Sequence, residues 1–129
     1  MRICLDTNAY SDFRKGRPGY DRILEEAEEI LVPTTVIGEL EYGFLLGSRL
    51  RENEDELSDF LSMPGIRELP ISRGIAERYA YVKATLKKNG TPIPENDIWI
   101  AAAALESGAR LVTYDSHFAK VGGLVCIAP

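Results

Sequence analysis

The sequence predicts a three-layer α/β/α protein built on one sheet of five parallel strands. Short apolar runs alternate along the chain with segments whose apolar residues recur every three or four positions, the pattern of strands alternating with helices. Such alternation favours a parallel sheet with helices on both faces. No linker, repeat or low-complexity tract interrupts it, so residues 1–129 are expected to form a single domain.

Five apolar runs are predicted to be the strands. They lie at residues 3–5, 31–32, 66–71, 111–113 and 124–127. Pro33 stops the second run, and Pro64-Gly65 precedes the third, as expected for residues that interrupt regular structure. The first and fourth runs lead into an acid, Asp6 and Asp115. In a parallel sheet the active crevice lies beyond the carboxyl ends of the strands, so these two acids are expected at that edge.

Helices are predicted between the strands. Apolar spacing indicates them at residues 8–15, 23–27, 36–44, 57–61, 75–86 and 97–107. Thr34 or Thr35 is suited to cap the third helix, and Ser72 the fifth. Gly108 ends the sixth, which is apolar almost all round and is therefore expected in the middle of the fold.

The composition excludes several classes of protein. A chain of 129 residues with 45% hydrophobic and 27% charged residues has the balance of a folded globular protein. No apolar run approaches the roughly 20 residues that span a bilayer, and the start MRICLDTNAY lacks the features of a secretory signal. We therefore expect a cytoplasmic protein whose mature chain begins here. Cys4 and Cys126 are expected to be buried, reduced thiols.

Four acidic residues lie in or next to apolar segments, where a charged side chain calls for a structural or functional explanation. Asp6 ends an apolar strand, Glu39 lies one turn into an apolar helix, Asp97 lies in the first turn of the most apolar helix, and Asp115 ends the fourth strand. Strand ends and helix starts share one rim of a parallel α/β sheet. The topology is therefore expected to bring the four carboxylates together.

Gathered carboxylates raise one another's pKa, and a divalent cation removes that conflict. Oxygen ligands suit Mg²⁺ or Mn²⁺, which keep several waters and accept phosphate as a further ligand. His117 is the only histidine, so a mechanism with two histidines is excluded. Metal-assisted hydrolysis of a phosphodiester is the reaction that this set of residues predicts.

Each acid also has a purely structural interpretation. Asp6 could cap a helix, Glu39 and Asp97 could stabilise helix dipoles, and Asp115 could begin a turn. An aspartyl-phosphate phosphatase is disfavoured because Asn8 stands where that chemistry needs a second acid, and the acidic pair and lysine of a phosphate-receiver domain are not evident. His117 is expected to be a local structural residue, and Trp99 a core residue rather than a base-stacking one.

The ordered set of motifs resembles the PIN-domain family, in particular the toxin of a VapBC-type toxin–antitoxin pair. The motifs are Asp6-Thr7-Asn8, Gly38-Glu39-Leu40 with Tyr42-Gly43, Gly90-x-Pro92-Ile93, Asn96-Asp97, and Thr113-x-Asp115-x-His117-Phe118. The resemblance covers essentially the whole chain. It implies a Mg²⁺- or Mn²⁺-dependent endoribonuclease that dimerises and is neutralised by a cognate antitoxin, as a homodimer or a toxin–antitoxin hetero-oligomer. A non-catalytic PIN-like module that binds RNA or protein is the alternative.

The resemblance also implies roles for individual residues. Asp6, Glu39, Asp97 and Asp115 would be the catalytic, metal-binding acids, with Asp6 and Asp97 as principal ligands. A further group would orient those carboxylates. Its members are Thr7, Asn8 and Thr113.

The net charge of −5, from 20 acids and 15 bases, conflicts with RNA binding, for which a basic protein is expected. Bound divalent ions would offset it, and we suggest a basic lip for RNA, with solvated helix ends as the alternative interpretation. Its residues would be Arg14, Lys15, Arg17, Lys87 and Lys88.

A surplus of apolar residues predicts a partner surface, unless it belongs to an ordinary thick core. The residues concerned are the stretch Tyr42-Gly43-Phe44-Leu45-Leu46 together with Tyr10 and Phe13.

Overall fold

The computed structural model describes all residues from Met1 to Pro129 and has the predicted five-stranded parallel sheet. The strands are β1 (Arg2–Leu5), β2 (Glu29–Pro33), β3 (Ile66–Leu69), β4 (Arg110–Val112) and β5 (Cys126–Ile127). Their order in the sheet is β3-β2-β1-β4-β5. The chain therefore leaves β1 in one direction and later returns to β4 on its other side, so the crevice where ligands bind in such folds lies between β1 and β4.

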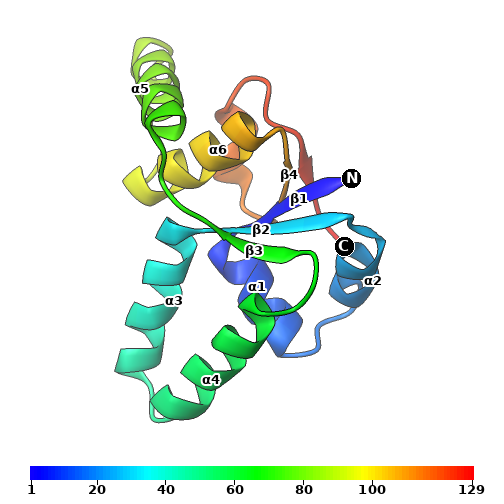
Figure 1. Cartoon of the computed structure of the whole chain (residues 1–129). Helices are drawn as coiled ribbons and strands as arrows, with labels where there is room; N and C mark the ends of the chain where they lie inside the picture. Colours follow the sequence, from blue (N-terminus) through cyan, green and yellow to red (C-terminus); the bar gives the residue numbers. More distant parts are fainter.

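Six α-helices and one short 3₁₀ helix accompany the sheet. They are α1 (Thr7–Arg14), α2 (Tyr20–Glu26), α3 (Thr34–Leu46), α4 (Leu50–Leu61), α5 (Arg73–Lys88), α6 (Glu95–Ser107) and η1 (Ser116–Lys120). Figure 1 shows α5 and α6 on one side of the sheet and α1, α3 and α4 on the other. The three layers and the parallel sheet confirm the predicted fold class.

Helix α6 lies at the centre of the molecule, as its composition predicts. Its buried residues are Ile98, Ile100, Ala101, Ala102, Ala103 and Ala104. The small alanine side chains allow α6 to approach both the sheet and α5 closely. Gly108 ends the helix with a left-handed φ of 65°, a conformation that glycine adopts without a steric penalty.

Several local predictions were wrong. The N-cap of α3 is Pro33, and the Thr34 hydroxyl donates instead to the Leu69 carbonyl. Strands β3 and β5 are shorter than the apolar runs that predicted them, and η1 was not predicted. Cys4 is buried, as expected, but Cys126 is exposed because β5 lies at the edge of the sheet. Ser72 does cap α5, where its hydroxyl accepts from the Ile75 N–H.

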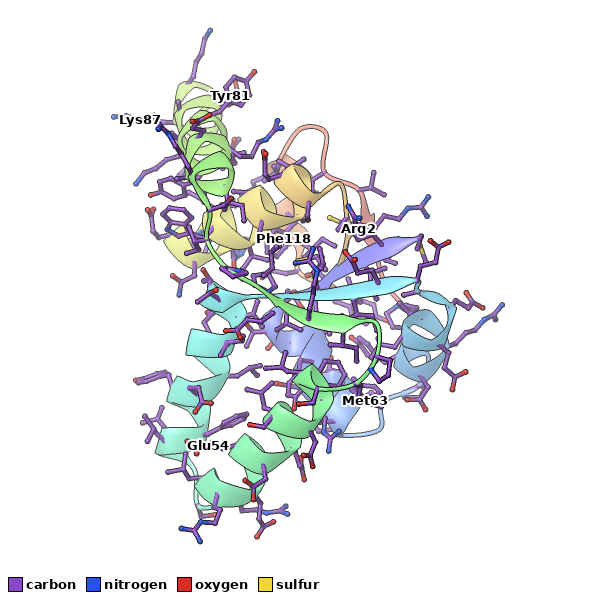
Figure 2. The ribbon with its side chains drawn as sticks, in the orientation of Figure 1. Arg2, Glu54, Met63, Tyr81, Lys87 and Phe118 are labelled. Carbon is purple, nitrogen blue, oxygen red and sulfur yellow. The ribbon has the colours of Figure 1, made fainter.

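No helix combines the length and the hydropathy that crossing a lipid bilayer requires. The main core instead joins both layers of helices through the sheet, and all of its fully buried strand residues come from β1, β2 and β4. Figure 2 shows Phe118 of η1 directed into this interior, where it is 1% exposed. The 3₁₀ helix is thereby fixed against the sheet, and its first turn carries part of the site described next.

Candidate active site

The four predicted acids lie at the carboxyl edge of the sheet. Asp6 follows β1 and Asp115 follows the neighbouring strand β4 after two residues, while Glu39 and Asp97 come from α3 and from the first turn of α6. Oxygen atoms of Asp97 and Asp115 and a ring nitrogen of His117 all lie within 4.8 Å of one another. The arrangement is therefore a compact polar cluster with an acidic periphery.

Asp6 is the most deeply buried of the four acids, at 5% exposed. Its Oδ1 accepts from the Ala9 N–H at 2.7 Å and caps α1, and its Oδ2 accepts from the Thr113 hydroxyl. The same hydroxyl oxygen accepts from the Asp115 N–H at 2.9 Å. Thr113 thus links the two acids that follow β1 and β4. Asp6 both caps α1 and lies with the other acids at the edge of the sheet.

Asp115 also combines a structural role with its place in the cluster. Its Oδ1 accepts from the His117 N–H at 2.9 Å and caps η1. The same Oδ1 lies 3.1 Å from the imidazole Nδ1 of His117, and Oδ2 of Asp97 lies 3.1 Å from that nitrogen. Because ionised carboxylates only accept hydrogen bonds, Nδ1 is the protonated ring nitrogen when both acids are charged.

Glu39 is held by polar neighbours on two other elements. The Thr7 hydroxyl donates to its Oε1 at 2.7 Å, and the Asn96 amide approaches its Oε2 at 3.5 Å. Thr7 and Thr113 therefore contact carboxylates as the predicted orienting groups should. Asn8 is exposed and hydrogen-bonds to none of the acids, whereas Asn96, which was not predicted, does so.

Burial and the neighbouring carboxylates disfavour the ionised forms of Asp6 and Asp97. Burial raises the pKa of Asp6, and nearby Asp115 and Asp97 raise it further, against the lowering effect of hydrogen bonds from Thr113 and Ala9. Burial also raises the pKa of Asp97; the hydrogen bond from His117 lowers it, and Asp115 and Glu39 raise it. A positive charge placed among these oxygens would relieve the repulsion.

The donor set fits a hard divalent cation. Carboxylate oxygens dominate it, there is no thiolate in the cluster, and a single imidazole is compatible with Mn²⁺ as well as Mg²⁺. Asp97 and Asp115 are close enough to share an ion, with His117 beside them. Asp6 lies outside this group of three, so its predicted place as a principal ligand beside Asp97 stays a prediction.

His117 was expected to be a structural residue bonded locally, and its contact with Asp115 agrees with this, whereas its contact with Asp97 was not predicted. The signal in the sequence was its position two residues after Asp115, where a turn of η1 returns the ring toward the acids.

Trp99 is half-buried, and its ring stacks on Tyr79 with centroids 3.8 Å apart. That contact lies between α5 and α6, in agreement with the packing role predicted for Trp99.

The predicted basic lip is divided between two layers. Arg14 and Lys15 line a hollow between α1, α3 and α4, where Arg14 pairs with Glu56 at 3.1 Å, and Arg17 pairs with Asp12. Lys87 projects from α5 on the other side of the sheet (Figure 2), and Lys88 is its neighbour. The five bases therefore form two separate surfaces.

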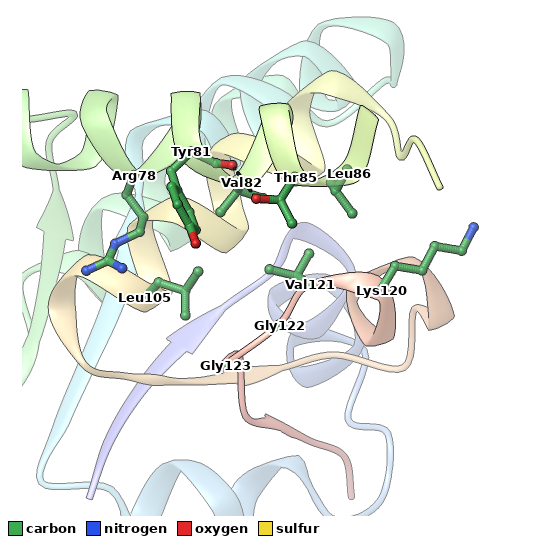
Figure 3. Close-up of a pocket in the computed structure, with 10 residues that line it drawn as sticks. All are labelled: Arg78, Tyr81, Val82, Thr85, Leu86, Leu105, Lys120, Val121, Gly122 and Gly123. Carbon is green, nitrogen blue, oxygen red and sulfur yellow. Dashed lines mark hydrogen bonds between the residues drawn. The ribbon is translucent and has the colours of Figure 1, made fainter. Parts of the chain in front are cut away.

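A cavity of about 420 Å³ lies apart from the acids, between α5 and the segment after η1. Figure 3 shows Val82, Leu86, Leu105 and Val121 around it, with Arg78 and Lys120 toward opposite ends. No carboxylate lines this cavity. It therefore lacks the groups that the predicted phosphodiester chemistry needs.

The predicted partner surface is partly present. Tyr42, Leu45 and Leu46 on α3 are 64%, 66% and 72% exposed. Tyr10, by contrast, is buried, and Phe13 is partly buried against the core; both rings pack on Phe60. These two residues belong to the core rather than to the surplus, because α4 covers this side of α1.

A parallel α/β sheet with carboxylates gathered at its carboxyl edge is typical of nucleases that use divalent metal ions. The model of the PIN domain matches residues 3–124. The chain belongs to the PIN-domain family, which confirms the resemblance drawn from the motifs.

Relatives in this family carry names that agree with one another. The chain is 33% identical over 115 residues to "Ribonuclease VapC2" of Haemophilus influenzae, covering 88% of this chain and 86% of the relative. It is 27% identical over 129 residues to "Ribonuclease VapC5" of Mycobacterium tuberculosis, covering 95% and 90%. Each alignment spans nearly the whole of both chains.

Solved structures agree with the fold. VapBC2 from Rickettsia felis, bound to a DNA fragment from its promoter, contains a chain with a TM-score of 0.87, 26% identity, and coverage of 99% of this chain and 98% of that one. VapBC-1 from nontypeable Haemophilus influenzae gives 0.86, 26%, and the same coverages.

Proposed function

We propose that this chain is a metal-dependent endoribonuclease and the toxin of a VapBC-type toxin–antitoxin pair. The observation that carries the proposal is the placement of Asp6, Glu39, Asp97 and Asp115 at the crevice between β1 and β4. Membership of the PIN-domain family and relatives named as VapC ribonucleases support it. RNA would be the substrate, and the cytoplasm the place of action.

The chain's own residues would divide the work of hydrolysis. Asp97 and Asp115 would hold Mg²⁺ or Mn²⁺, and Asp6 and Glu39 would complete the site directly or through water. The ion would supply Lewis-acid activation and would neutralise charge at the scissile phosphate. Thr7 and Thr113 would keep the carboxylates oriented, since each donates its hydroxyl hydrogen to one of them.

The reaction is hydrolysis of a phosphodiester. A water oxygen forms a bond to phosphorus, the bond from phosphorus to one ribose oxygen breaks, and the water's proton is carried away as that oxygen gains one. His117 would hold its Nδ1 proton toward Asp97 and Asp115.

The test is cleavage of a panel of RNAs by the purified protein, with Mg²⁺, with Mn²⁺ and in chelator. Metal-dependent new ends within the RNA are expected, and Asp97→Asn should reduce their formation by at least about a hundredfold. The matched control is Asp59→Asn, which changes an exposed acid on α4. If the chain is instead a non-catalytic RNA- or protein-binding module, RNA will stay intact under every condition.

The exposed part of α3 supports a protein partner. Leu45 and Leu46 lie next to each other on the surface near the end of the helix, where burial of both would be favourable. Solved relatives are complexes described as VapBC. We infer that a cognate antitoxin covers these residues in a toxin–antitoxin hetero-oligomer.

A further inference from the structure

A hollow of about 600 Å³ lies beside Glu39, on the side of the acids that faces α3. It is wide open to solvent, so a ligand there would be covered on one side only. The residues that line it come from α1, α3 and α6, and they are Thr7, Thr35, Gly38, Glu39, Tyr42 and Asn96. Glu39 therefore belongs both to the acidic cluster and to this hollow.

Neither the backbone conformation nor the packing of the folded chain requires a glycine at position 38. It lies within α3, its φ is not left-handed, and a Cβ built on it would meet no atom within 4 Å. Glycine inside a helix lowers its stability relative to alanine. Neither backbone conformation nor packing accounts for Gly38, and its missing side chain leaves this part of the hollow open.

The chemistry of the lining indicates which part of a nucleotide would fit. No lysine or arginine lines the hollow, and Glu39 contributes a negative charge, so a phosphate group would be repelled there. The groups present are hydroxyls, a side-chain amide, a carboxylate and the ring of Tyr42, which is 64% exposed. These groups match a nucleobase, which stacks on aromatic rings, and a ribose, which donates through its hydroxyls.

Tyr42 is placed to act together with Gly38 and Glu39. It is four residues after Gly38 and three after Glu39, so the three positions share one face of α3. No hydrogen bond holds the Tyr42 side chain within the chain. The ring is thus free to form one wall of the hollow, with the bare backbone of Gly38 as its floor.

We propose that this hollow binds the nucleobase and ribose next to the scissile phosphate of an RNA, with Tyr42 stacking on the base. The inference rests on the proposed ribonuclease function and assigns one nucleotide position of its substrate. The phosphate lies at the acids, the ribose passes over Gly38, and Asn96 and Thr35 face the edge of the base. Tyr42 is accordingly a determinant of substrate affinity.

Gly38 offers a graded test with its own control. Gly38→Ala should raise the melting temperature by a few degrees, since it removes a helical glycine without a clash, and it fills little of the hollow. Gly38→Leu should melt no lower than the wild type but fill the space. Tyr42→Phe keeps the ring, and Tyr42→Ala removes it.

Two measurements apply to each variant. The first is the affinity for fluorescent oligo(A), oligo(C) and oligo(U) in chelator. The second compares the rate of RNA cleavage with the rate of hydrolysis of bis-p-nitrophenyl phosphate, a small diester with no nucleobase. Gly38→Leu and Tyr42→Ala should weaken oligonucleotide binding by about tenfold or more and raise the KM for RNA with little change in kcat. Gly38→Ala and Tyr42→Phe should stay within about threefold of the wild type, and small-diester hydrolysis should be unchanged.

Three outcomes would overturn the inference. RNA affinity could be unchanged in both Gly38→Leu and Tyr42→Ala, or small-diester hydrolysis could fall as much as RNA cleavage, which would indicate damage to the acids. The variants could also lose only the binding of a co-encoded protein, which would assign the hollow to that partner. If the wild type cleaves no RNA with any metal, the proposed function fails, whereas the binding series still reports on the hollow.

Discussion

The hydroxyl of Thr113, one residue beyond β4, donates a hydrogen bond to Oδ2 of Asp6, one residue beyond β1. Both side chains are 5% exposed, so water cannot readily replace this bond. Parallel pairing of β1 with β4 places the two residues opposite each other, and the bond connects the strands on either side of the crevice. Formation of the sheet thereby positions a buried carboxylate of the site.

The contact predicts the effect of replacing Thr113 by valine, which has the same shape but no hydroxyl. The change leaves Asp6 Oδ2 and the Asp115 N–H without their partner. A buried polar group left unsatisfied costs about 1–3 kcal/mol, so the free energy of unfolding should fall by that amount in urea titrations. Thr113→Ser, which keeps the hydroxyl, should lose less than half as much; an equal loss would assign the effect to the methyl group.

Crowding of the acids predicts how Asp97→Asn changes stability. In chelator the substitution removes one of several repelling charges, so the melting temperature should stay the same or rise by a few degrees. With saturating Mg²⁺ or Mn²⁺ the wild type should gain stability by mass action, and Asp97→Asn should lose most of that gain. A full metal-induced rise in the variant, measured by calorimetry, would exclude Asp97 as a ligand.

The same crowding predicts a pH dependence. The pKa values of Asp6 and Asp97 are raised above the usual value of an aspartic acid, so the folded chain binds their protons more tightly than the unfolded chain does. Their contribution to stability is present below the unfolded pKa and is lost as the pH rises through the raised values. In chelator, the stability of the wild type relative to Asp97→Asn should therefore improve as the pH falls from 7 toward 4. A constant or opposite difference would contradict the crowding.

The sequence predicted the acidic edge because the relevant information is local. Asp6 and Asp115 follow apolar runs, and Asp97 begins an apolar helix, so topology alone brings them to one rim. The contact between His117 and Asp97 depends on η1, a short 3₁₀ turn whose existence no periodicity shows. Tyr10 was misjudged for a related reason: which face of a helix is covered depends on distant elements such as α4. The approach of the Asn96 amide to Glu39 was not predicted, since it depends on how α6 lies against α3.

Substitution of Arg14 and Lys15 tests whether the basic surface on the α1 side binds RNA. Each phosphate contact on a single strand contributes about −0.7 to the slope of log affinity against log salt concentration. Replacing both by alanine should weaken RNA binding and flatten the slope by about 1.4 if both contact phosphates. Because Arg14 also pairs with Glu56, a circular-dichroism melt should accompany the titration. The double variant of Lys87 and Lys88 isolates the other surface, and an unchanged slope for either pair removes that pair from RNA binding.

Leu45 and Leu46 test whether the exposed end of α3 binds a partner rather than RNA. Replacing both by serine removes apolar surface that is already in water, so the stability of the isolated chain should change by no more than about 0.5 kcal/mol. If a co-encoded antitoxin covers these side chains, its affinity should fall by about a hundredfold or more, because burial of each leucine contributes about 1.5–3 kcal/mol. RNA cleavage by the free variant should equal that of the wild type, since neither residue lines the hollow beside Glu39. Ile71, 48% exposed beyond β3, supplies the matched control: Ile71→Ser removes a similar apolar side chain that is not part of α3 and should leave the antitoxin bound. Isothermal titration of the antitoxin into each variant measures this, and unchanged affinity in the Leu45 and Leu46 double variant would place the partner on another face.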